Sequence, residues 1–277
     1  MSESGTPEIH QKSEKRITRY YFLILFLIAN GISYLLLPIY INPYTEEIKS
    51  TSGSSYSFPI IYVILIVAFA AFFIFMARSK KVSLLKTLIY IFTGYTLLVI
   101  LNFDLSFLSP VVDLLISIVT TVVILYYTYK GNSASLTILG LILGSGVALL
   151  LASIFSFYVT LIIGTIFSIY DALSVVLIGS MVEMAQTAMD HGMPLLFTYG
   201  KSDDKIAMGF GDVIIPTFVL FSILTNFGLN AYLISLILAL ISFIPINILA
   251  TKRPQPGLPF LINSIFLGLI LFILLFK

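Results

Sequence analysis

The sequence predicts an all-α polytopic membrane protein with nine transmembrane helices. Of its 277 residues, 59% are hydrophobic and only 10% are charged. The mean hydropathy of +1.07 is far above that of a water-soluble domain, because a soluble domain of this size needs a polar shell. The apolar residues also fall into runs of about 20, the length that a helix needs to cross roughly 30 Å of hydrocarbon.

Nine such runs follow one another along the chain, and their ends are defined to about two to four residues. They lie near 17–41, 59–77, 84–101, 107–129, 134–152, 157–178, 206–226, 230–250 and 256–276. The fifth and sixth runs are the hardest to separate, since the segment LASIFSFYV between them offers only a weak break.

These runs divide the chain into four parts. The segment 1–16 is polar and contains acids, so it is expected to be a disordered tail. Six helices follow at 17–178, and a short cytoplasmic loop is expected at 179–205. The last three helices are expected within 206–277.

The distribution of basic residues predicts the orientation in the membrane. With the N-terminus in the cytoplasm, the cytoplasmic segments hold 13 of the 15 Lys and Arg residues, and the outer segments hold only Lys49 and Lys277. This bias follows the positive-inside rule and supports both the orientation and the number of spans. One span more or fewer in the middle would destroy the alternation. The C-terminus is then expected outside.

The composition argues against several kinds of site. Cysteine is absent, so the chain has no disulfide, thiolate nucleophile or thiolate metal ligand. The only histidines, His10 and His191, lie outside the apolar runs and are too few for a histidine metal cluster. No basic run indicates nucleic acid. We therefore expect no metal, no cofactor and no nucleic-acid partner.

Three of the 13 acidic residues fall inside predicted spans: Asp113, Asp171 and Asp212. Asp113 is only about two turns from the outer end of its span, so it can reach headgroups or cap a helix. Asp171 and Asp212 are six or seven residues from the predicted cytoplasmic face, on consecutive antiparallel helices. At 1.5 Å per residue, both lie on the order of 10 Å deep.

A buried acid in a membrane helix needs a reason. An ionised Asp at the centre of such a helix costs roughly 2.5–3.5 kcal/mol, and somewhat less at this depth. No Lys or Arg lies in a span centre to neutralise Asp171 and Asp212. A working pair of carboxylates is the favoured interpretation. The alternatives are a structural role, in which one Asp caps a kinked helix and the other bonds the backbone, and proton or ion transport.

Small residues accompany both acids. Gly164 and Ser168 share the predicted helix face of Asp171, and Gly209 is expected on the face of Asp212. Small residues let membrane helices approach closely, so the two carboxylates are expected to meet.

Three further residues are interpreted by their effect on helix geometry. Pro216, four residues after Asp212, is expected to weaken the hydrogen bond to the carbonyl of that aspartate and to kink the helix. Gly140 and Gly144 have the GxxxG spacing in the fifth span, and ordinary helix packing is expected of them.

A close pair of aspartates in a low-dielectric site would share one proton, because both cannot ionise comfortably. The ionised carboxylate can take a proton from water while the protonated one polarises a peptide carbonyl. This chemistry hydrolyses a peptide bond without a metal or a covalent intermediate. It requires a hydrated cavity open to the cytoplasm and local unwinding of a helical substrate.

At these residues the chain resembles the presenilin and signal peptide peptidase family of intramembrane aspartyl proteases. That family has nine spans, with the motifs YD in the sixth, GxGD in the seventh and PAL at the start of the ninth. The corresponding residues here are Tyr170, Asp171, Gly209, Phe210, Gly211, Asp212, Pro256, Gly257, Leu258 and Pro259. YD and GxGD are weak signals alone, but the three in this order are specific, and the similarity covers nearly the whole chain after the tail.

The resemblance implies an aspartic endopeptidase in which Asp171 and Asp212 are catalytic. The other motif residues would shape the site or bind substrate. The predicted orientation is that of presenilins, which implies N-out, single-pass transmembrane proteins as substrates. The compact chain is closest to microbial, especially archaeal, homologues that act alone, which implies a microbial cell membrane. The oligomeric state is not predicted.

Two features depart from the family pattern. Gly257 replaces the alanine of PAL, a change between small residues that is expected to be tolerated. The loop 179–205 is much shorter than the presenilin loop and offers no obvious segment for self-cleavage, so the chain is expected to act uncut.

Three alternative functions use the same carboxylates. An ion- or proton-coupled transporter would bind ions between them. Such a transporter is expected to contain inverted repeats, which the sequence does not show. A prepilin-type peptidase also has GxGD, but it has fewer spans and continues into a polar segment where this chain has VIIP. A non-catalytic leak pathway would survive substitution of both aspartates.

Overall fold

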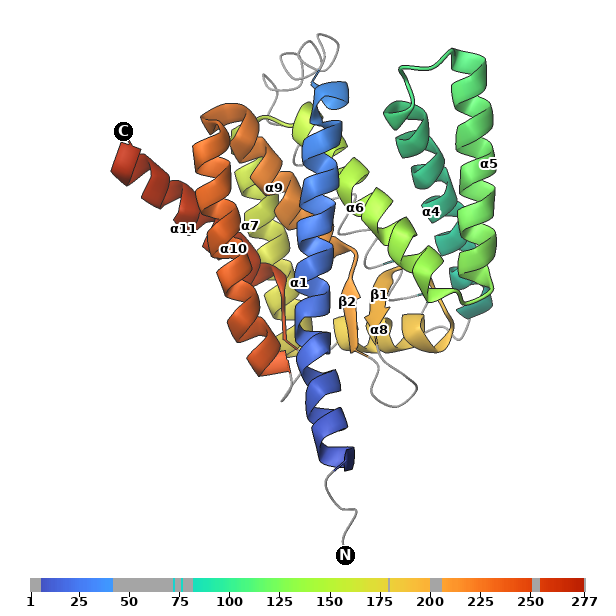
Figure 1. The fold of residues 1–277 in the computed structure, drawn as a ribbon, viewed down its shortest axis with the longest axis horizontal. Helices are drawn as coiled ribbons and strands as arrows, with labels where there is room; N and C mark the ends of the chain where they lie inside the picture. Colours follow the sequence, from blue (N-terminus) through green and yellow to red (C-terminus); the bar gives the residue numbers. More distant parts are fainter. Residues whose placement is uncertain are drawn as a thin grey trace, which may run out of the picture.

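The computed structural model describes residues 6–41, 72, 76, 82–178, 180–199, 206–250 and 255–276 (Figure 1). Side chains are described from Tyr20 onward, except at 177–181, 206 and 247–250. The described elements are α1 (Thr6–Tyr40), α4 (Val82–Asp104), α5 (Pro110–Tyr129), α6 (Ser133–Ile154), α7 (Phe157–Leu173), the π-helix η1 (Ser174–Ile178), α8 (Ser180–Asp190), β1 (Leu196–Tyr199), β2 (Ile206–Gly209), α9 (Gly211–Phe227), α10 (Leu229–Ala250) and α11 (Leu258–Phe276).

The mostly helical polytopic membrane fold is confirmed. In the described part of the chain, seven helices are long and apolar enough to cross a membrane, and α9 is a shorter apolar helix of 17 residues. Eight of the nine predicted spans thus correspond to described helices. The second, 59–77, lies outside the described residues apart from Phe72 and Met76, which are helical. The weak break before the sixth span is real, because α6 ends at Ile154 and α7 begins at Phe157.

The structure corrects the all-α prediction at one place. Residues Ile206–Gly209, predicted as the start of a helix, form strand β2, which pairs antiparallel with β1 from Leu196↔Gly209 to Tyr199↔Ile206. Gly209 and Gly211 weaken a helix here, whereas the aromatic and β-branched residues of β1 favour a strand. The predicted loop 179–205 therefore contains α8 and β1.

The N-terminal segment also differs from its prediction. Helix α1 begins at Thr6, so residues 6–16 of the expected disordered tail are helical. This segment is rich in Glu, Gln, Lys and Arg, which are good helix formers. Once the membrane span has formed a helix, each further residue adds one hydrogen bond without a new nucleation cost.

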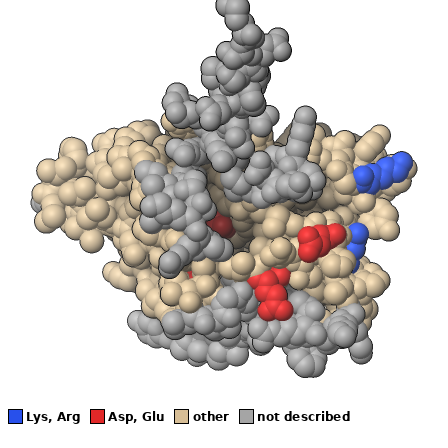
Figure 2. Space-filling view, turned by 90° about the horizontal axis from the view of Figure 1, so that it is seen from below, with Lys and Arg blue, Asp and Glu red and all other residues tan. Residues whose placement is uncertain are grey.

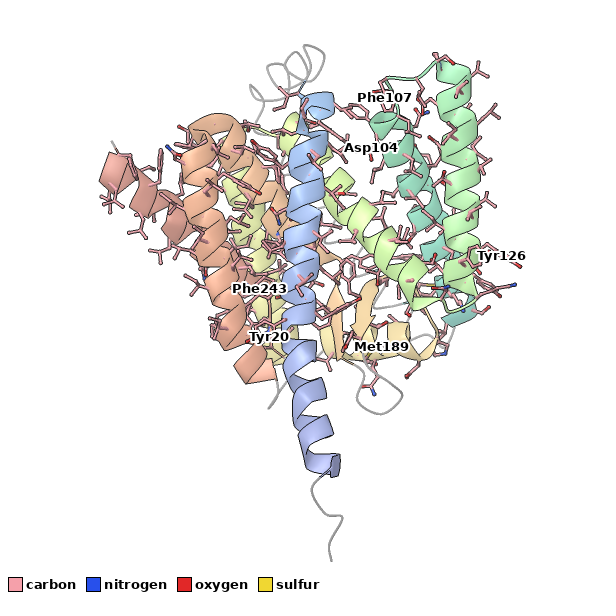
Figure 3. All side chains as sticks on the ribbon, in the orientation of Figure 1. Tyr20, Asp104, Phe107, Tyr126, Met189 and Phe243 are labelled. Carbon is pink, nitrogen blue, oxygen red and sulfur yellow. The ribbon has the colours of Figure 1, made fainter. Side chains whose placement is uncertain are left out.

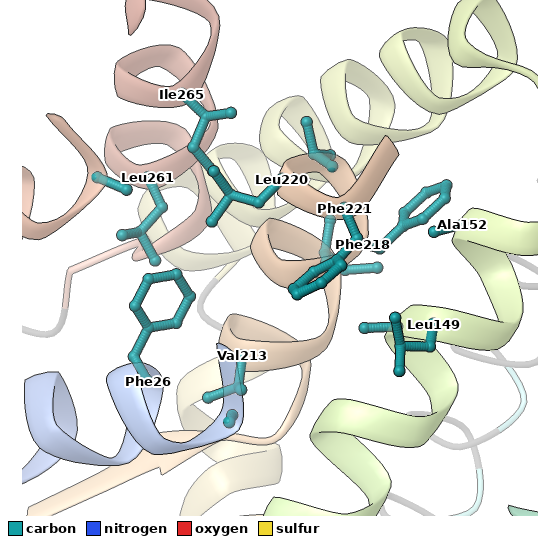
Figure 4. Close-up of a cluster of buried hydrophobic side chains, with 14 of the residues drawn as sticks. Phe26, Leu149, Ala152, Val213, Phe218, Leu220, Phe221, Leu261 and Ile265 are labelled. Atoms are coloured by element: carbon teal, nitrogen blue, oxygen red, sulfur yellow. The ribbon is translucent and has the colours of Figure 1, made fainter. Parts of the chain in front are cut away.

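Helix α9 is the centre of the packed bundle. It contacts α1, α6, α7, α10 and α11, and every residue from Ile215 to Ile223 is buried. Figure 4 shows Phe218, Leu220 and Phe221 of α9 among side chains from several of these helices. A helix that is apolar all round is stable only when neighbours cover it on all sides, as they do here.

Glycines allow several of these helix contacts to be close. A Cβ atom at Gly164 of α7 would lie 3.1 Å from Val219 of α9. A Cβ at Gly268 of α11 would lie only 2.5 Å from the Cα of Ser235 in α10. Gly164 therefore acts as predicted, since it brings the helix of Asp171 against the helix of Asp212.

Helix α1 runs along one side of the bundle and joins parts distant in sequence. The hydroxyl of Tyr40, at its end, donates to Asp104 Oδ1 at 2.7 Å. Tyr21 bonds Thr137 of α6 at 3.1 Å and packs on Tyr199 of β1 with ring centroids 4.6 Å apart. Figure 3 shows Asp104 at the upper end of the molecule, and Met189 of α8 at the lower end.

The two ends of the bundle are unlike. α8, β1 and β2 gather at the lower end, toward the start of α1, whereas the C-terminus lies near the opposite end (Figure 1). The hairpin leads directly into α9, and this connection positions the candidate site.

Candidate active site

Asp171 lies in the last turn of α7 and is 6% exposed. The helix changes to the π-helix η1 three residues later, and π turns are frequent at functional sites. The hydroxyl of Ser174 donates to the Asp171 carbonyl at 3.2 Å. The carboxylate itself accepts a hydrogen bond from the backbone N–H of Leu258 at 3.1 Å.

Asp212 lies in the first turn of α9, not two turns inside a helix as predicted. The reason is strand β2, which occupies the residues expected to form the preceding turn. Its last residue, Gly209, directs its N–H at the Asp212 carboxylate. A carboxylate in the first turn also interacts favourably with the helix dipole. The prediction that Gly209 shares a helix face with Asp212 is therefore wrong, although the two residues do lie together.

The PGLP segment lies beside both aspartates. Its Gly257 carbonyl accepts the first hydrogen bond of α11, from the N–H of Leu261 at 3.2 Å. The N–H groups at the start of α11 have no partner within the helix, and they point at Asp171. The N–H of Leu258 donates to the Asp171 carboxylate, and the N–H of Gly257 faces it.

The same segment lies beside Asp212. A Cβ atom at Gly257 would lie 3.4 Å from Asp212 Oδ1. The Cα of one residue and the nitrogen of the next are about 2.4 Å apart, so both carboxylates lie beside one peptide unit, Gly257–Leu258. The two carboxylates are also close enough to interact electrostatically.

A scaffold that the sequence did not reveal supports the GFGD segment. Phe210 is buried, and its N–H donates to the Leu195 carbonyl at 3.0 Å. Its ring meets Phe197 of β1 edge-on, with centroids 4.7 Å apart. Both rings pack against Gly140 of α6. A Cβ atom at Gly140 would lie 2.5 Å from Phe197 and 2.6 Å from Phe210. Gly140 packs closely, as expected, although its neighbours are two aromatic rings beside the candidate site and not another helix.

The remaining motif residues surround the pair at different distances from it. Tyr170 is half-buried beside Asp171, and Pro256 is buried before the start of α11. Pro259 lies in the first turn of α11, where backbone N–H groups have no partner within the helix. Its lack of an N–H therefore costs no helical hydrogen bond. Gly211 is exposed, and a Cβ there would meet no atom within 4 Å, so nothing in the structure requires glycine at that position.

Asp113, the third acid predicted within a span, has a local partner. It is 6% exposed in the first turn of α5 and accepts a hydrogen bond from Ser117 Oγ at 3.2 Å. A position at the start of a helix and a hydroxyl donor one turn away stabilise an aspartate in a structural role. These contacts explain Asp113 without a catalytic role.

Figure 2 views the lower end of the molecule and shows acidic side chains on its outer surface and further acidic atoms set back from it. Asp212 itself is partly exposed. In the part of the chain that the structure describes, no group of three His, Cys, Asp or Glu side chains could hold a metal ion.

Comparisons with known proteins decide the family. The model of the family described as "Signal-peptide peptidase, presenilin aspartyl protease" matches residues 22–204, more than half of the chain. The chain belongs to this family. A search of curated proteins found no match. The matched residues include Asp171 and end before Asp212.

Solved structures of presenilin-type proteins share the fold. Two of them are structures of a presenilin family intramembrane aspartate protease, one in space group C222 and one in space group P2. The first has a TM-score of 0.63 at 19% identity and covers 90% of this chain and 94% of that chain. The second has a TM-score of 0.66 at 20% identity, with 91% and 96% covered. Family membership makes the chain an intramembrane aspartyl protease, which confirms the predicted enzyme class.

Proposed function

We propose that Asp171 and Asp212 form the catalytic pair of this presenilin-family protease and hydrolyse peptide bonds within transmembrane segments of membrane proteins. The observation that supports this most strongly is the Gly257–Leu258 peptide unit. It donates to one carboxylate at 3.1 Å and, at its other end, would place a Cβ 3.4 Å from the second. Two acids that lie beside one peptide unit of the backbone can both contact a substrate peptide.

The chemistry follows from a pair that holds one proton. The ionised carboxylate takes a proton from a water molecule, and the resulting hydroxide attacks the carbonyl carbon of the scissile bond. The protonated carboxyl gives its proton to the carbonyl oxygen, which produces a neutral tetrahedral diol. When the C–N bond breaks, the leaving nitrogen takes a proton from the first carboxyl, and a diol hydroxyl returns its proton to the second. The pair thereby regains its starting state.

The placement of the site sets its access. Both aspartates adjoin the elements of the lower end, β2 with α9 for Asp212 and η1 for Asp171. We infer that this end faces the cytoplasm, because the positive-inside bias puts the loop 179–205 there. Water would then reach the pair from the cytoplasm.

The substrates proposed are single-pass transmembrane proteins with an N-out orientation. The same charge bias supports nine spans, with the N-terminus in the cytoplasm and the C-terminus outside. Residues 1–16, 17–178, 179–205 and 206–277 would then be the tail, the six-helix part with YD, the cytoplasmic loop, and the three-helix part with GxGD and PGLP. The proposed location is the cell membrane of a microbe.

The test compares three aspartates of the predicted spans in one assay. Asp171→Asn and Asp212→Asn keep the side-chain volume and remove the charge, so each should abolish cleavage of a reconstituted transmembrane substrate. Asp113→Asn is the matched control and should cleave at the wild-type rate, because Asp113 lies on α5 with its own hydroxyl partner. Thermal unfolding would verify that all three variants fold. Turnover by either Asp171→Asn or Asp212→Asn would exclude the proposed pair.

A further inference from the structure

Asn30 of α1 makes buried polar contacts in the middle of an apolar span. Its side chain is 2% exposed. Its Nδ2 donates to Thr217 Oγ1 of α9 at 3.2 Å and to the Phe26 carbonyl of its own helix at 2.9 Å. The hydroxyl of Tyr232 in α10 donates to Asn30 Oδ1 at 3.5 Å. One side-chain amide thus links three helices. Because the amide is buried, no water replaces a hydrogen-bond partner that is removed.

The contact reaches α9 at a weak point of that helix. Thr217 follows Pro216, which has no N–H, so the carbonyl of Asp212 lacks its helical donor. The turn that carries Asp212 is anchored at its start, where the Phe210 carbonyl accepts from the N–H groups of residues 213 and 214 at 3.1 and 3.0 Å. Helical bonding therefore fixes this turn less firmly to the rest of α9 than it would in an unbroken helix.

The neighbours of α9 make its position matter for the site. It contacts α7, which carries Asp171, and α11, which begins with PGLP. It also contacts α1, which supplies Asn30. Apolar packing alone lets helices slide by small amounts, whereas a hydrogen bond between two buried side chains fixes one register.

We propose that Asn30 is a positioning residue for the reaction. Through Thr217 it holds α9 in the register that sets the distance between Asp212 and Asp171. This inference rests on the proposed catalytic pair. Sequence patterns did not single out Asn30, although a lone amide in an apolar span is a signal that could have done so.

The test uses substitutions at Thr217 that differ by one group. Thr217→Val keeps the shape but removes the acceptor, and Thr217→Ser keeps the hydroxyl. The control is Ser222→Ala in the same helix, because the Ser222 hydroxyl is buried and has no hydrogen-bond partner in the described structure. For each variant, kcat and KM for a reconstituted substrate are measured per folded enzyme.

We expect Thr217→Val to lower kcat by about tenfold to a hundredfold, the scale for a catalytic group displaced by up to about 1 Å, with KM nearly unchanged. Thr217→Ser should restore most of kcat, and Ser222→Ala should match the wild type. Asn30→Ala combined with Thr217→Val should be no worse than the poorer single variant.

Other results would overturn the inference. A merely structural bond would lower the melting temperature of Thr217→Val but leave its kcat unchanged, and so would contradict a positioning role. Equal defects in Thr217→Val and Thr217→Ser, or additive losses in the double variant, would do the same. If Asp171→Asn or Asp212→Asn still cleaves, the catalytic pair fails. If both are inactive and Thr217→Val is fully active, only the role of Asn30 fails.

Discussion

A single methyl group at Gly140 is expected to impair the protease, although α6 carries no catalytic residue. A Cβ at this position would lie 2.5 Å from Phe197 and 2.6 Å from Phe210. Carbon atoms pack best at about 3.5–4.0 Å, so both rings would have to retreat by roughly 1 Å. Phe197 is fully buried and Phe210 is buried as well, which leaves neither ring free space.

The displacement would reach the catalytic pair, because Asp212 is two residues from Phe210. Overpacking of a buried site costs about 1–3 kcal/mol of stability. A shift of about 1 Å in a catalytic group can cost about a hundredfold in rate. We therefore expect Gly140→Ala to lower kcat by up to about a hundredfold while the protein still folds.

The assay is cleavage of a transmembrane substrate in lipid, with thermal unfolding measured in parallel. Two other glycines provide graded controls. At Gly144 a Cβ would lie 3.1 Å from Val213, so a shift of a few tenths of an ångström suffices and a smaller loss is expected. At Gly31 a Cβ would meet nothing within 4 Å, so Gly31→Ala should keep full activity and gain about 0.5–1 kcal/mol of stability. Full activity in Gly140→Ala would refute the packing argument.

Contacts near the pair and far from it have different expected effects on activity and on stability. Gly257→Ala should stay active in the cleavage assay, since its Cβ would lie in ordinary contact 3.4 Å from Asp212, whereas Gly257→Leu should be inactive; the reverse order would contradict this placement. Tyr40→Phe should lower the unfolding free energy by about 1.5–3 kcal/mol without changing kcat, because it removes the 2.7 Å bond to Asp104. Asn132→Ala should cost about 1 kcal/mol in the same measurement, because Asn132 caps the first N–H groups of α6; an unchanged melting temperature would argue against the cap.

The membrane fold could be predicted because its cause is local. In lipid, a helix must satisfy the hydrogen bonds of its backbone N–H and C=O groups within its own segment. A run of apolar residues therefore defines a span without knowledge of its neighbours. The starts of α7 and α10 were thus predicted to within one residue. Strand β2 could not be predicted in this way, because its hydrogen bonds go to β1, a partner several residues away whose identity the apolar pattern does not contain.

The candidate site also has a part that could be predicted from the sequence and a part that could not. Asp171 and Asp212 were recognisable because a carboxylate in an apolar span is costly, whatever surrounds it. The N–H of Leu258 at Asp171 was not predictable, since it depends on where α11 begins relative to α7. The contacts of Phe197 with Gly140 likewise join β1 to α6, and only the folded chain brings them together.

The most direct test of the whole account is the rate of substrate cleavage by Asp171→Asn, Asp212→Asn and the double variant, measured side by side in lipid. Groups that act as one unit lose nearly all activity when either is removed. We predict that each single variant is as inactive as the double variant. Measurable turnover in one single variant, with further loss in the double variant, would contradict it.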